Sequence, residues 1–198
     1  MSPELVGLAL ADPPERWEAL GFSVEDGVCP VGGVDVQLGA PGRGITGWAV
    51  TGLKAVLDGL PEAAVGAERP PATHPNGATG IDHVVVMTPD FDRTTAALEE
   101  AGIQLRRVVE RPDGNRMGFR RLGPAILELV EVGELTPGPA RFWGLVVVVA
   151  DLDALAERLG DHLSAIEDAV QPGRRIASLR ASAGLGEAVA FMSAEADR

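Results

Sequence analysis

One stretch of the sequence, residues 80–132, contains a complete folding unit of one strand, one helix and three further strands. It opens with Gly-Ile-Asp-His-Val-Val-Val-Met, whose β-branched residues predict a strand over 81–88. Asp90 is a good helix cap, and the apolar spacing after it predicts a helix over 93–101 that ends at Gly102. Turn residues then separate three further predicted strands, over 103–110, 116–122 and 125–132.

The same order of elements returns in residues 141–193, and this repetition constrains the fold more than any other feature. The predicted elements of this second unit are strands over 142–150, 175–180 and 188–193, with a helix over 151–159. Alignment of the two helix starts places His83 opposite Gly144. Alignment of the turns before the two last strands places Glu128 opposite Phe191.

Residues 4–60 repeat the unit in a shorter form. The predicted elements are strands over 5–11, 22–25, 28–31 and 34–38, with a helix over 15–20. In this alignment Gln37 falls opposite Glu128, whereas Leu5 falls opposite His83. A strand over 45–51 and a helix over 53–60 would begin another unit, whose last three strands are missing.

Three regions follow from this pattern. Residues 1–60 are predicted to form a shortened βαβββ unit followed by a partial βα unit. Residues 61–79 are rich in proline and glycine and are predicted to be a linker. Residues 80–198 are predicted to form one domain of two complete βαβββ units.

The net charge and the cysteine content limit the classes of partner and of site that this protein can have. The formal net charge of −12 at pH 7 disfavours binding to nucleic acid and to anionic membranes. The single cysteine, Cys29, excludes intramolecular disulfides and a cysteine-based zinc site. No signal-peptide pattern is visible, and the longest apolar run, near 144–150, is too short to span a bilayer. We therefore expect a cytoplasmic protein that binds a small molecule, and leave a homodimer open.

Six arginines stand out in the first unit against the acidic composition: Arg106, Arg107, Arg111, Arg116, Arg120 and Arg121. They are either solvated residues of strands and loops or the lining of a locally positive cavity for an anionic ligand. Under the second interpretation, the candidate ligand-binding residues are Arg107 and Arg120, together with the apolar Met87, Trp143 and Phe191. Core packing is the simplest role for Trp143, and a stacking platform for an aromatic ligand is the alternative.

A repeated strand–helix–three-strand unit, with His83 on its first strand and Glu128 on its fourth, resembles the vicinal oxygen chelate superfamily. That group includes glyoxalases, extradiol dioxygenases, epimerases and bleomycin-type resistance proteins. The segment Gly-Ile-Asp-His-Val-Val-Val-Met-Thr-Pro-Asp-Phe-Asp is similar to the opening of its glyoxalase-like members. The resemblance implies an α+β fold whose paired βαβββ units form curved, cup-like mixed sheets with helices on the outside. It does not indicate the reaction, because one scaffold hosts many chemistries.

His83 and Glu128 are the candidate catalytic residues. Alternation along the strand places His83 on one face together with Ile81 and Val85. An imidazole and a carboxylate among apolar residues need partners if they are buried. We expect both side chains to face the cup and to contact each other or a ligand. The alternative is a satisfied His–Glu pair with no function.

The resemblance also bears on metal binding. In the metalloenzymes of the superfamily, each unit gives one ligand from its first strand and one from its fourth, and open positions hold substrate oxygens. Here one unit gives His83 and Glu128, but the other gives Gly144 and Phe191, whose side chains cannot ligate. We therefore expect no stoichiometric divalent metal unless Gln37 or a second chain completes the shell.

Two classes of function stay open. An enzyme acting on a small molecule, of the lyase, isomerase or dioxygenase type, would use His83 and Glu128 as metal ligands or as an acid–base pair. A non-catalytic protein would instead sequester a small hydrophobic or anionic compound, as resistance members of the superfamily do. Retention of His83 and Glu128 favours the first class, and loss of the counterpart ligands favours the second. His74 and His162 are expected in a loop and on the surface.

Overall fold

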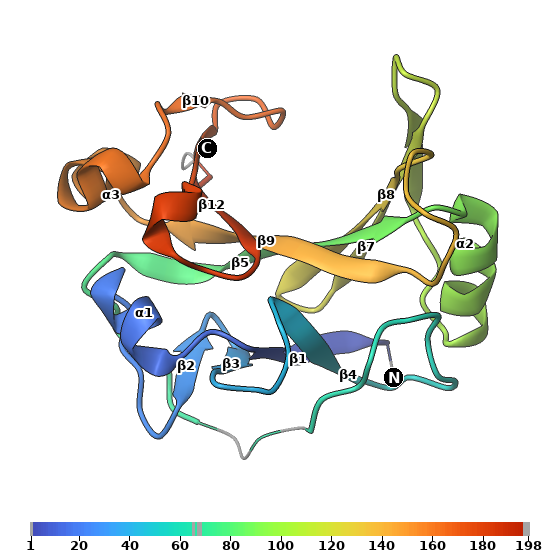
Figure 1. Cartoon of the computed structure of the whole chain (residues 1–198), viewed down its shortest axis with the longest axis horizontal. Coiled ribbons are helices and arrows are strands. Elements are labelled where there is room, and N and C mark those ends of the chain that lie inside the picture. Colours follow the sequence, from blue (N-terminus) through green and yellow to red (C-terminus); the bar gives the residue numbers. More distant parts are fainter. Residues whose placement is uncertain (1, 65, 67–68, 196–198) are drawn as a thin grey trace.

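The computed structural model describes residues 2–64, 66 and 69–195. The predicted boundaries at residues 1 and 198, and part of the predicted 61–79 linker, lie outside the described residues. The chain forms two β-sheets, one of four strands from its N-terminal part and one of eight strands from the rest (Figure 1). In Figure 1 the smaller sheet lies beneath the larger one, whose two ends rise above its middle. No helix within these ranges has the length and apolar character needed to cross a membrane.

The eight-stranded sheet contains both predicted units in one layer, in the order β10-β11-β12-β9-β5-β8-β7-β6. Its strands are β5 (Ala78–Thr88), β6 (Arg107–Glu110), β7 (Arg116–Leu122), β8 (Ala125–Glu131), β9 (Arg141–Val149), β10 (Glu167–Asp168), β11 (Arg175–Ser178) and β12 (Ala188–Ser193). The helices α2 (Phe91–Glu100) and α3 (Leu152–Leu159) follow the first strand of each unit, and short 3-10 turns lie at Gly160–His162 and Ala181–Ala183. The prediction of two βαβββ units in one curved mixed sheet is confirmed.

Both helices are capped by the aspartates that the sequence indicates, although α2 begins at Phe91 rather than at Arg93. The Asp90 carboxylate accepts a hydrogen bond from the Arg93 N–H at 3.0 Å, and the Asp151 carboxylate accepts one from the Ala154 N–H at 3.0 Å. Each bond satisfies an N–H group that has no partner within the helix. The two aspartates are therefore equivalent caps, which supports aligning the units on them.

The first strands of the two units pair with each other at the centre of the sheet. In the antiparallel β5–β9 pair, His83 lies opposite Val146 and Val85 lies opposite Gly144. This crossed pattern is expected if an approximate twofold axis relates the units, with Gly144 the counterpart of His83 and Val146 the counterpart of Val85. The first half of the sequence alignment is thereby confirmed.

The N-terminal part is a smaller copy of the same arrangement. It contains β1 (Glu4–Leu10), α1 (Pro14–Ala19), β2 (Val28–Val31), β3 (Val34–Gln37) and β4 (Ile45–Thr51), in the sheet order β2-β3-β1-β4. Strand β1 pairs with β3 in parallel and with β4 antiparallel, as β5 pairs with β8 and β9. This order and pairing of strands is the one expected for a shortened copy of the unit.

A piece of the linker covers the open edge of this copy. The Trp48 N–H donates to the Pro61 carbonyl at 3.0 Å, and the Ala63 N–H donates to the Trp48 carbonyl at 2.8 Å. Residues 61–63 thus run beside β4 where the missing half of the unit would have paired. An uncovered edge strand would be free to pair with another chain.

The predicted helix over 53–60 is wrong. These residues are irregular apart from a turn at 58–59, and the Lys54 N–H donates to the Ala101 carbonyl at the end of α2, at 3.1 Å. Leu57 and Leu60 are buried. Helix propensity is a weak preference, and here contacts with the rest of the fold override it.

Two predicted strands are shorter than expected or missing. Residues 22–25 form only a single bridge between Glu25 and Val28, because the chain turns inward to bury Phe22 after α1. The strand predicted over 103–110 begins only at Arg107, since Ile103 is buried beside α2 rather than paired in the sheet. Both errors concern buried apolar residues next to a helix end.

One face of the eight-stranded sheet is buried in the hydrophobic core, and we call it the dry face. Val84 and Val86 of β5 and Leu127 and Leu129 of β8 are buried on it. Aromatic contacts join this face to the N-terminal part: the ring centres of Phe22 and Phe191 are 6.2 Å apart, and those of Trp48 and Phe142 are 5.5 Å apart. Burial of each such side chain contributes about 1.5–3 kcal/mol. In the part of the chain that the structure describes, none of these aromatic contacts lies on the opposite face, which we call the open face.

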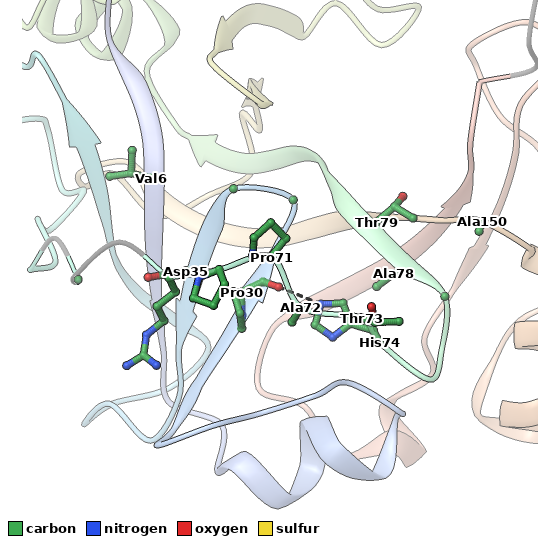
Figure 2. A pocket seen from close by; sticks show the side chains of 16 residues that line it. Val6, Pro30, Asp35, Pro71, Ala72, Thr73, His74, Ala78, Thr79 and Ala150 are labelled. Carbon is green, nitrogen blue, oxygen red and sulfur yellow. Dashed lines mark hydrogen bonds between the residues drawn. The ribbon is translucent and has the colours of Figure 1, made fainter.

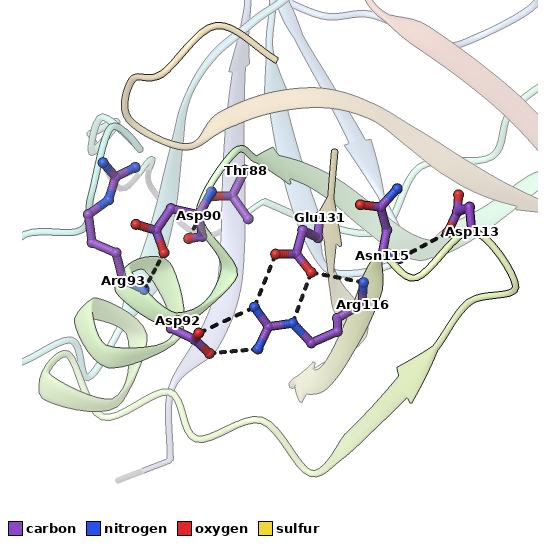
Figure 3. A network of polar contacts seen from close by, with 8 residues as sticks. All are labelled: Thr88, Asp90, Asp92, Arg93, Asp113, Asn115, Arg116 and Glu131. Atoms are coloured by element: carbon purple, nitrogen blue, oxygen red, sulfur yellow. Dashed lines mark hydrogen bonds and ion pairs between the residues drawn. The ribbon is translucent and has the colours of Figure 1, made fainter. Parts of the chain in front are cut away.

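A polar network fastens α2 to the sheet (Figure 3). The Arg116 guanidinium lies 2.7 Å from Asp92 Oδ1 and 2.9 Å from Glu131 Oε2, and it stacks over the Phe91 ring at 4.6 Å. Hydrogen bonds from Arg116 hold the pKa of Glu131 below its usual range. Arg116 therefore has a structural role at the start of α2.

Candidate functional site

A β-bulge in β5 creates the polar centre of the open face. Ile81 pairs with Val147, but His83 pairs with Val146, so Asp82 is an extra residue in the strand. Neighbours along a regular strand point to opposite faces, whereas a bulge can turn both to one side. Asp82 Oδ2 lies 2.9 Å from His83 Nδ1. The bulge also moves Ile81 to the dry face, so the expected grouping of Ile81 with His83 is wrong.

Four side chains form a continuous chain of polar contacts. Arg174, next to β11, pairs with Asp82, and its Nε donates to the Ser193 carbonyl at 2.9 Å. Asp82 contacts His83, and His83 Nε2 lies 3.2 Å from Glu128 Oε2. The expected contact between His83 and Glu128 is present.

These groups are mostly buried but still reach solvent. The side chains of His83 and Glu128 are 12% and 14% exposed, and that of Arg174 is 7% exposed. Burial of this degree strengthens electrostatic interactions, because water screens them less.

The pKa values of the Asp82 and Glu128 carboxyl groups are shifted in opposite directions. Burial alone would raise the pKa of Asp82, but hydrogen bonds from His83 and Arg174 outweigh it and lower the pKa to about 2. Burial raises the pKa of Glu128, opposed by the nearby charge of His83. Asp82 is therefore held as the anion, whereas burial favours the neutral form of Glu128.

The fixed anion determines which ring nitrogen of His83 is free. An ionised carboxylate only accepts hydrogen bonds, so Asp82 requires a proton on Nδ1. In the neutral imidazole, Nε2 is then a bare acceptor directed at Glu128. One proton can occupy either side of this contact, as Glu128 O–H with neutral imidazole or as carboxylate with imidazolium. The arrangement is suited to general acid–base chemistry.

The last strand of the second unit is shifted by one residue relative to the sequence alignment. Glu128 lies beside Val85, and Val146, the counterpart of Val85, lies beside Ala190. The counterpart of Glu128 is therefore Ala190, and the prediction of Phe191 is wrong. A shift of one residue moves a side chain to the other face of the sheet. Phe191 is accordingly 0% exposed and lies on the dry face.

No family model and no curated protein matches the sequence. Among solved structures, methylmalonyl-CoA epimerase from Mycobacterium tuberculosis is 20% identical, and the match covers 61% of this chain and 91% of that chain with a TM-score of 0.48. A Streptomyces coelicolor methylmalonyl-CoA epimerase variant is 19% identical over 60% of this chain and 96% of that chain, with a TM-score of 0.48. A hypothetical protein from Bacillus halodurans is 13% identical over 60% and 96%, with a TM-score of 0.48.

The strand order is the deciding observation for the fold. Two βαβββ units meet through their first strands, and each first strand pairs in parallel with the fourth strand of its own unit. Residues 78–193 have the vicinal oxygen chelate fold. The open face is the cup of this fold, and the helices lie outside it.

The residues in the cup do not fit a vicinal oxygen chelate metal centre. One unit offers His83 Nε2 and Glu128, but the counterpart positions are Gly144 and Ala190. A Cβ at Gly144 would collide with the Ala188 carbonyl oxygen of β12, so a ligating side chain has no room there. Among the residues that the structure describes, no group of three or more His, Cys, Asp or Glu side chains is arranged to hold a metal ion.

Gln37 does not complete the set. Strand β5 is flanked by β8 and β9, so no strand of the N-terminal part pairs beside His83 and brings Gln37 towards it. Gln37 lies in the smaller sheet, where its Nε2 donates to the Ala64 carbonyl at 3.3 Å.

Three of the predicted ligand-binding residues lie on the open face. Met87 shares this face because its partner Val130 alternates with Glu128 along β8. Arg107 pairs with Phe119, which pairs with Glu128, and the Arg107 guanidinium lies 5.8 Å from the Phe119 ring centre. The third is Trp143.

Trp143 is the extra residue of a second bulge, in β9. Val85 of β5 pairs with Gly144 and Val86 pairs with Phe142, so Trp143 has no partner in β5. Its side chain is 48% exposed, unlike the neighbouring Phe142, which packs against Trp48 of the smaller sheet. A stacking platform therefore fits the position of Trp143 better than the core packing that the sequence favours.

Arg120 is not on the open face. It pairs with Leu127, whose side chain is buried on the dry face, so the prediction of Arg120 as a ligand contact is wrong. Its neighbour Arg121 pairs with Ile126, which lies beside His83. The register thus places Arg121 on the open face, where its Nη1 donates to the Pro124 carbonyl at 3.4 Å.

Sequence reasoning missed Asp82 and Arg174. Strict alternation assigns Asp82 to the face opposite His83, and a bulge leaves no clear mark in the residues around it. Arg174 is 92 positions from its partner and lies in a turn. The only available signal was an aspartate directly before a strand histidine, which also occurs at unrelated sites.

A cavity of about 740 Å³ lies elsewhere, between the linker and the smaller sheet (Figure 2). Its lining includes Pro30, Asp35, Pro71 and His74, and none of the four side chains of the polar chain. His74 Nδ1 accepts from the Ser23 N–H at 3.1 Å, and Nε2 lies 2.9 Å from the Pro30 carbonyl. Burial lowers the pKa of His74. His74 is in a loop as expected, but its ring is a buried structural bridge.

Proposed function

We propose that the cup is a site where a small molecule exchanges a proton with His83 and Glu128, held in place by Asp82 and Arg174. One observation carries this proposal: the His83 ring is held between two carboxyl groups of opposite character, at 2.9 Å and 3.2 Å. Asp82 is kept ionised by Arg174, and Glu128 has a raised pKa. Titratable groups whose environments separate their pKa values are typical of acid–base sites.

Each of the four residues in the chain of polar contacts has a distinct role in this scheme. Arg174 keeps Asp82 ionised, and Asp82 holds the proton on Nδ1 and fixes the ring. The Nε2 atom takes the proton of Glu128 and leaves a carboxylate. That carboxylate accepts a proton from an acidic C–H or O–H of the bound molecule and later returns it, so no net charge is gained.

The reaction class that fits is reversible proton abstraction next to a carbonyl group. Arg107, Arg121 and Trp143 lie on the same face and would hold an anionic or aromatic part of the ligand. The alternative is a binding protein that sequesters such a compound. The bare counterpart positions Gly144 and Ala190 favour this alternative, since only one unit of the cup carries ionisable side chains at these positions.

Hydrogen–deuterium exchange at carbon tests the two possibilities. The purified protein is incubated in D₂O with a panel of thioesters and 1,3-dicarbonyl acids, including methylmalonyl-CoA, which is present in the solved structure of one methylmalonyl-CoA epimerase. Mass spectrometry then reports deuterium at the acidic carbon. The proposal predicts exchange for at least one compound that also binds, and a loss of about 10²–10⁴-fold in Glu128→Gln.

A matched control uses the exposed histidine. His162→Gln should leave exchange unchanged, whereas His83→Gln should abolish it without preventing folding. Binding by calorimetry with no exchange above the buffer rate would contradict the catalytic proposal and support sequestration.

A further inference from the structure

A second pair of carboxyl groups lies away from the cup, where the smaller sheet meets the larger one. Asp12 follows β1, and Glu187 directly precedes β12. The Gly186 N–H donates to Asp12 Oδ1 at 2.8 Å, across 174 positions of sequence. The backbone segments at Gly186 and Gly44 approach each other closely here, since a Cβ at Gly186 would lie 2.9 Å from the Gly44 nitrogen. The pair therefore lies within a close seam between the two parts of the chain.

Three of the four carboxyl oxygens in this pair have no partner. Asp12 is 4% exposed, and its Oδ2 and both oxygens of Glu187 are buried without a hydrogen bond. Within the described residues, no basic side chain forms an ion pair with either group. Arg16 of α1 approaches the backbone at Gly184 but is not paired with either carboxyl group. Two buried negative charges side by side would be very unfavourable.

We propose that Asp12 and Glu187 share one bound proton and act as a proton-dependent latch between the two sheets. A single O–H between the groups gives a donor and an acceptor to oxygens that are otherwise unsatisfied. Loss of that proton leaves two buried carboxylates that repel each other across the seam. The smaller sheet is then held less tightly on the larger one.

The direction of the titration agrees with this geometry. Burial, followed by the hydrogen bond and charge of Asp12, raises the pKa of Glu187 to about 9. The same group in an unfolded chain titrates near its ordinary value of about 4.3. The folded state therefore holds a proton that the unfolded state has lost. The stabilisation is complete below about pH 4 and declines as the pH rises towards 9.

The test compares urea unfolding of the full chain with that of Glu187→Gln between pH 5 and 9. The amide of Gln can donate to Asp12 Oδ2 at every pH, so the variant should not lose stability as the pH rises. We expect the ratio of the unfolding constants, native chain over variant, to rise several-fold per pH unit, up to about tenfold, the limit for one proton. Glu157→Gln, on the exposed face of α3, is the matched control and should show a flat ratio.

Two results would overturn the latch. One is a ratio for Glu187→Gln that is flat between pH 5 and 9, as for the control. The other is stabilisation of the native chain, but not of the variant, by millimolar Ca²⁺ or Mg²⁺ at pH 8, because a cation would then balance the charges instead of a proton. If Glu187→Gln does not fold, the ¹³C titration of the Glu187 carboxyl group in the native chain decides. A midpoint below pH 5 contradicts the proposal.

Discussion

Arg174 and Asp82 form an ion pair across the junction of the two units, one residue from each. The pair contacts His83 on the Nδ1 side of its ring, because the bulge in β5 turns Asp82 towards the imidazole. The polar centre of the open face is therefore asymmetric: the first unit supplies Asp82, His83 and Glu128, and the second supplies the Arg174 cation that pairs with Asp82.

Arg174→Met should destabilise the fold by about 3 kcal/mol, because it leaves the Asp82 carboxylate buried without its cation. Urea unfolding at pH 7 measures the effect. The adjacent Arg175 provides the control, since its pair with Asp153 is exposed and Arg175→Met should show no measurable change. A double variant that adds Asp82→Asn should recover part of the loss. Equal effects of Arg174→Met and Arg175→Met would contradict the assigned role of Arg174.

The acid limb of the stability profile should depend on Asp82. The folded pKa of about 2 is below the ordinary value of about 3.9, so the stabilisation is present above pH 4 and is lost as the pH falls towards 2. We expect Asp82 to contribute about 2 kcal/mol at pH 6 that is absent at pH 2. Asp82→Asn should flatten this part of the profile. An unchanged slope between pH 4 and pH 2 in the variant would contradict the assignment.

Gly144→Ala should destabilise the protein by about 1–3 kcal/mol, because the added methyl group meets the backbone of β12. Gly80 is a control in the central strand β5, where a Cβ would meet nothing within 4 Å, and Gly80→Ala should be close to neutral. Thermal unfolding of both variants provides the comparison. A neutral Gly144→Ala would show that the counterpart position of His83 in the second unit has room for a ligating side chain after all.

Phe191→Ala should cost about 3–5 kcal/mol in stability, because its ring fills the contact with Phe22 on the dry face. Any compound found to bind the cup should retain its affinity, provided that binding is measured at a temperature where the variant is folded. Trp143→Ala should do the reverse, with a small change in stability and weaker binding. Loss of binding in Phe191→Ala alone would place Phe191 in the cup and contradict the register of β12.

The repeated unit and its helix caps could be predicted from sequence because local patterns determine them. Asp90 and Asp151 each precede an amphipathic stretch, and the strands are separated by turn residues. The register of the last strand could not be predicted in this way. A one-residue difference between the units placed Phe191 where Ala190 belongs, and no local pattern distinguishes the two.

The candidate site was predictable only in part for similar reasons. His83 and Glu128 follow from the alternation of β5 and β8, which is local. Asp82 and Arg174 depend on a bulge and on a contact between distant parts of the chain, and both are properties of the folded sheet. The choice of Arg120 over Arg121 failed because residue type alone does not give the face of a strand.

The coupling between His83 and Glu128 underlies the proposed chemistry, and a ¹³C NMR titration of the Glu128 carboxyl group measures it. We predict a midpoint above the ordinary glutamate value, since burial raises the pKa of Glu128. We also predict a further rise in His83→Gln, because the charge of His83 opposes the effect of burial. A midpoint at the ordinary value of about 4.3, unchanged by His83→Gln, would contradict the proposed acid–base pair.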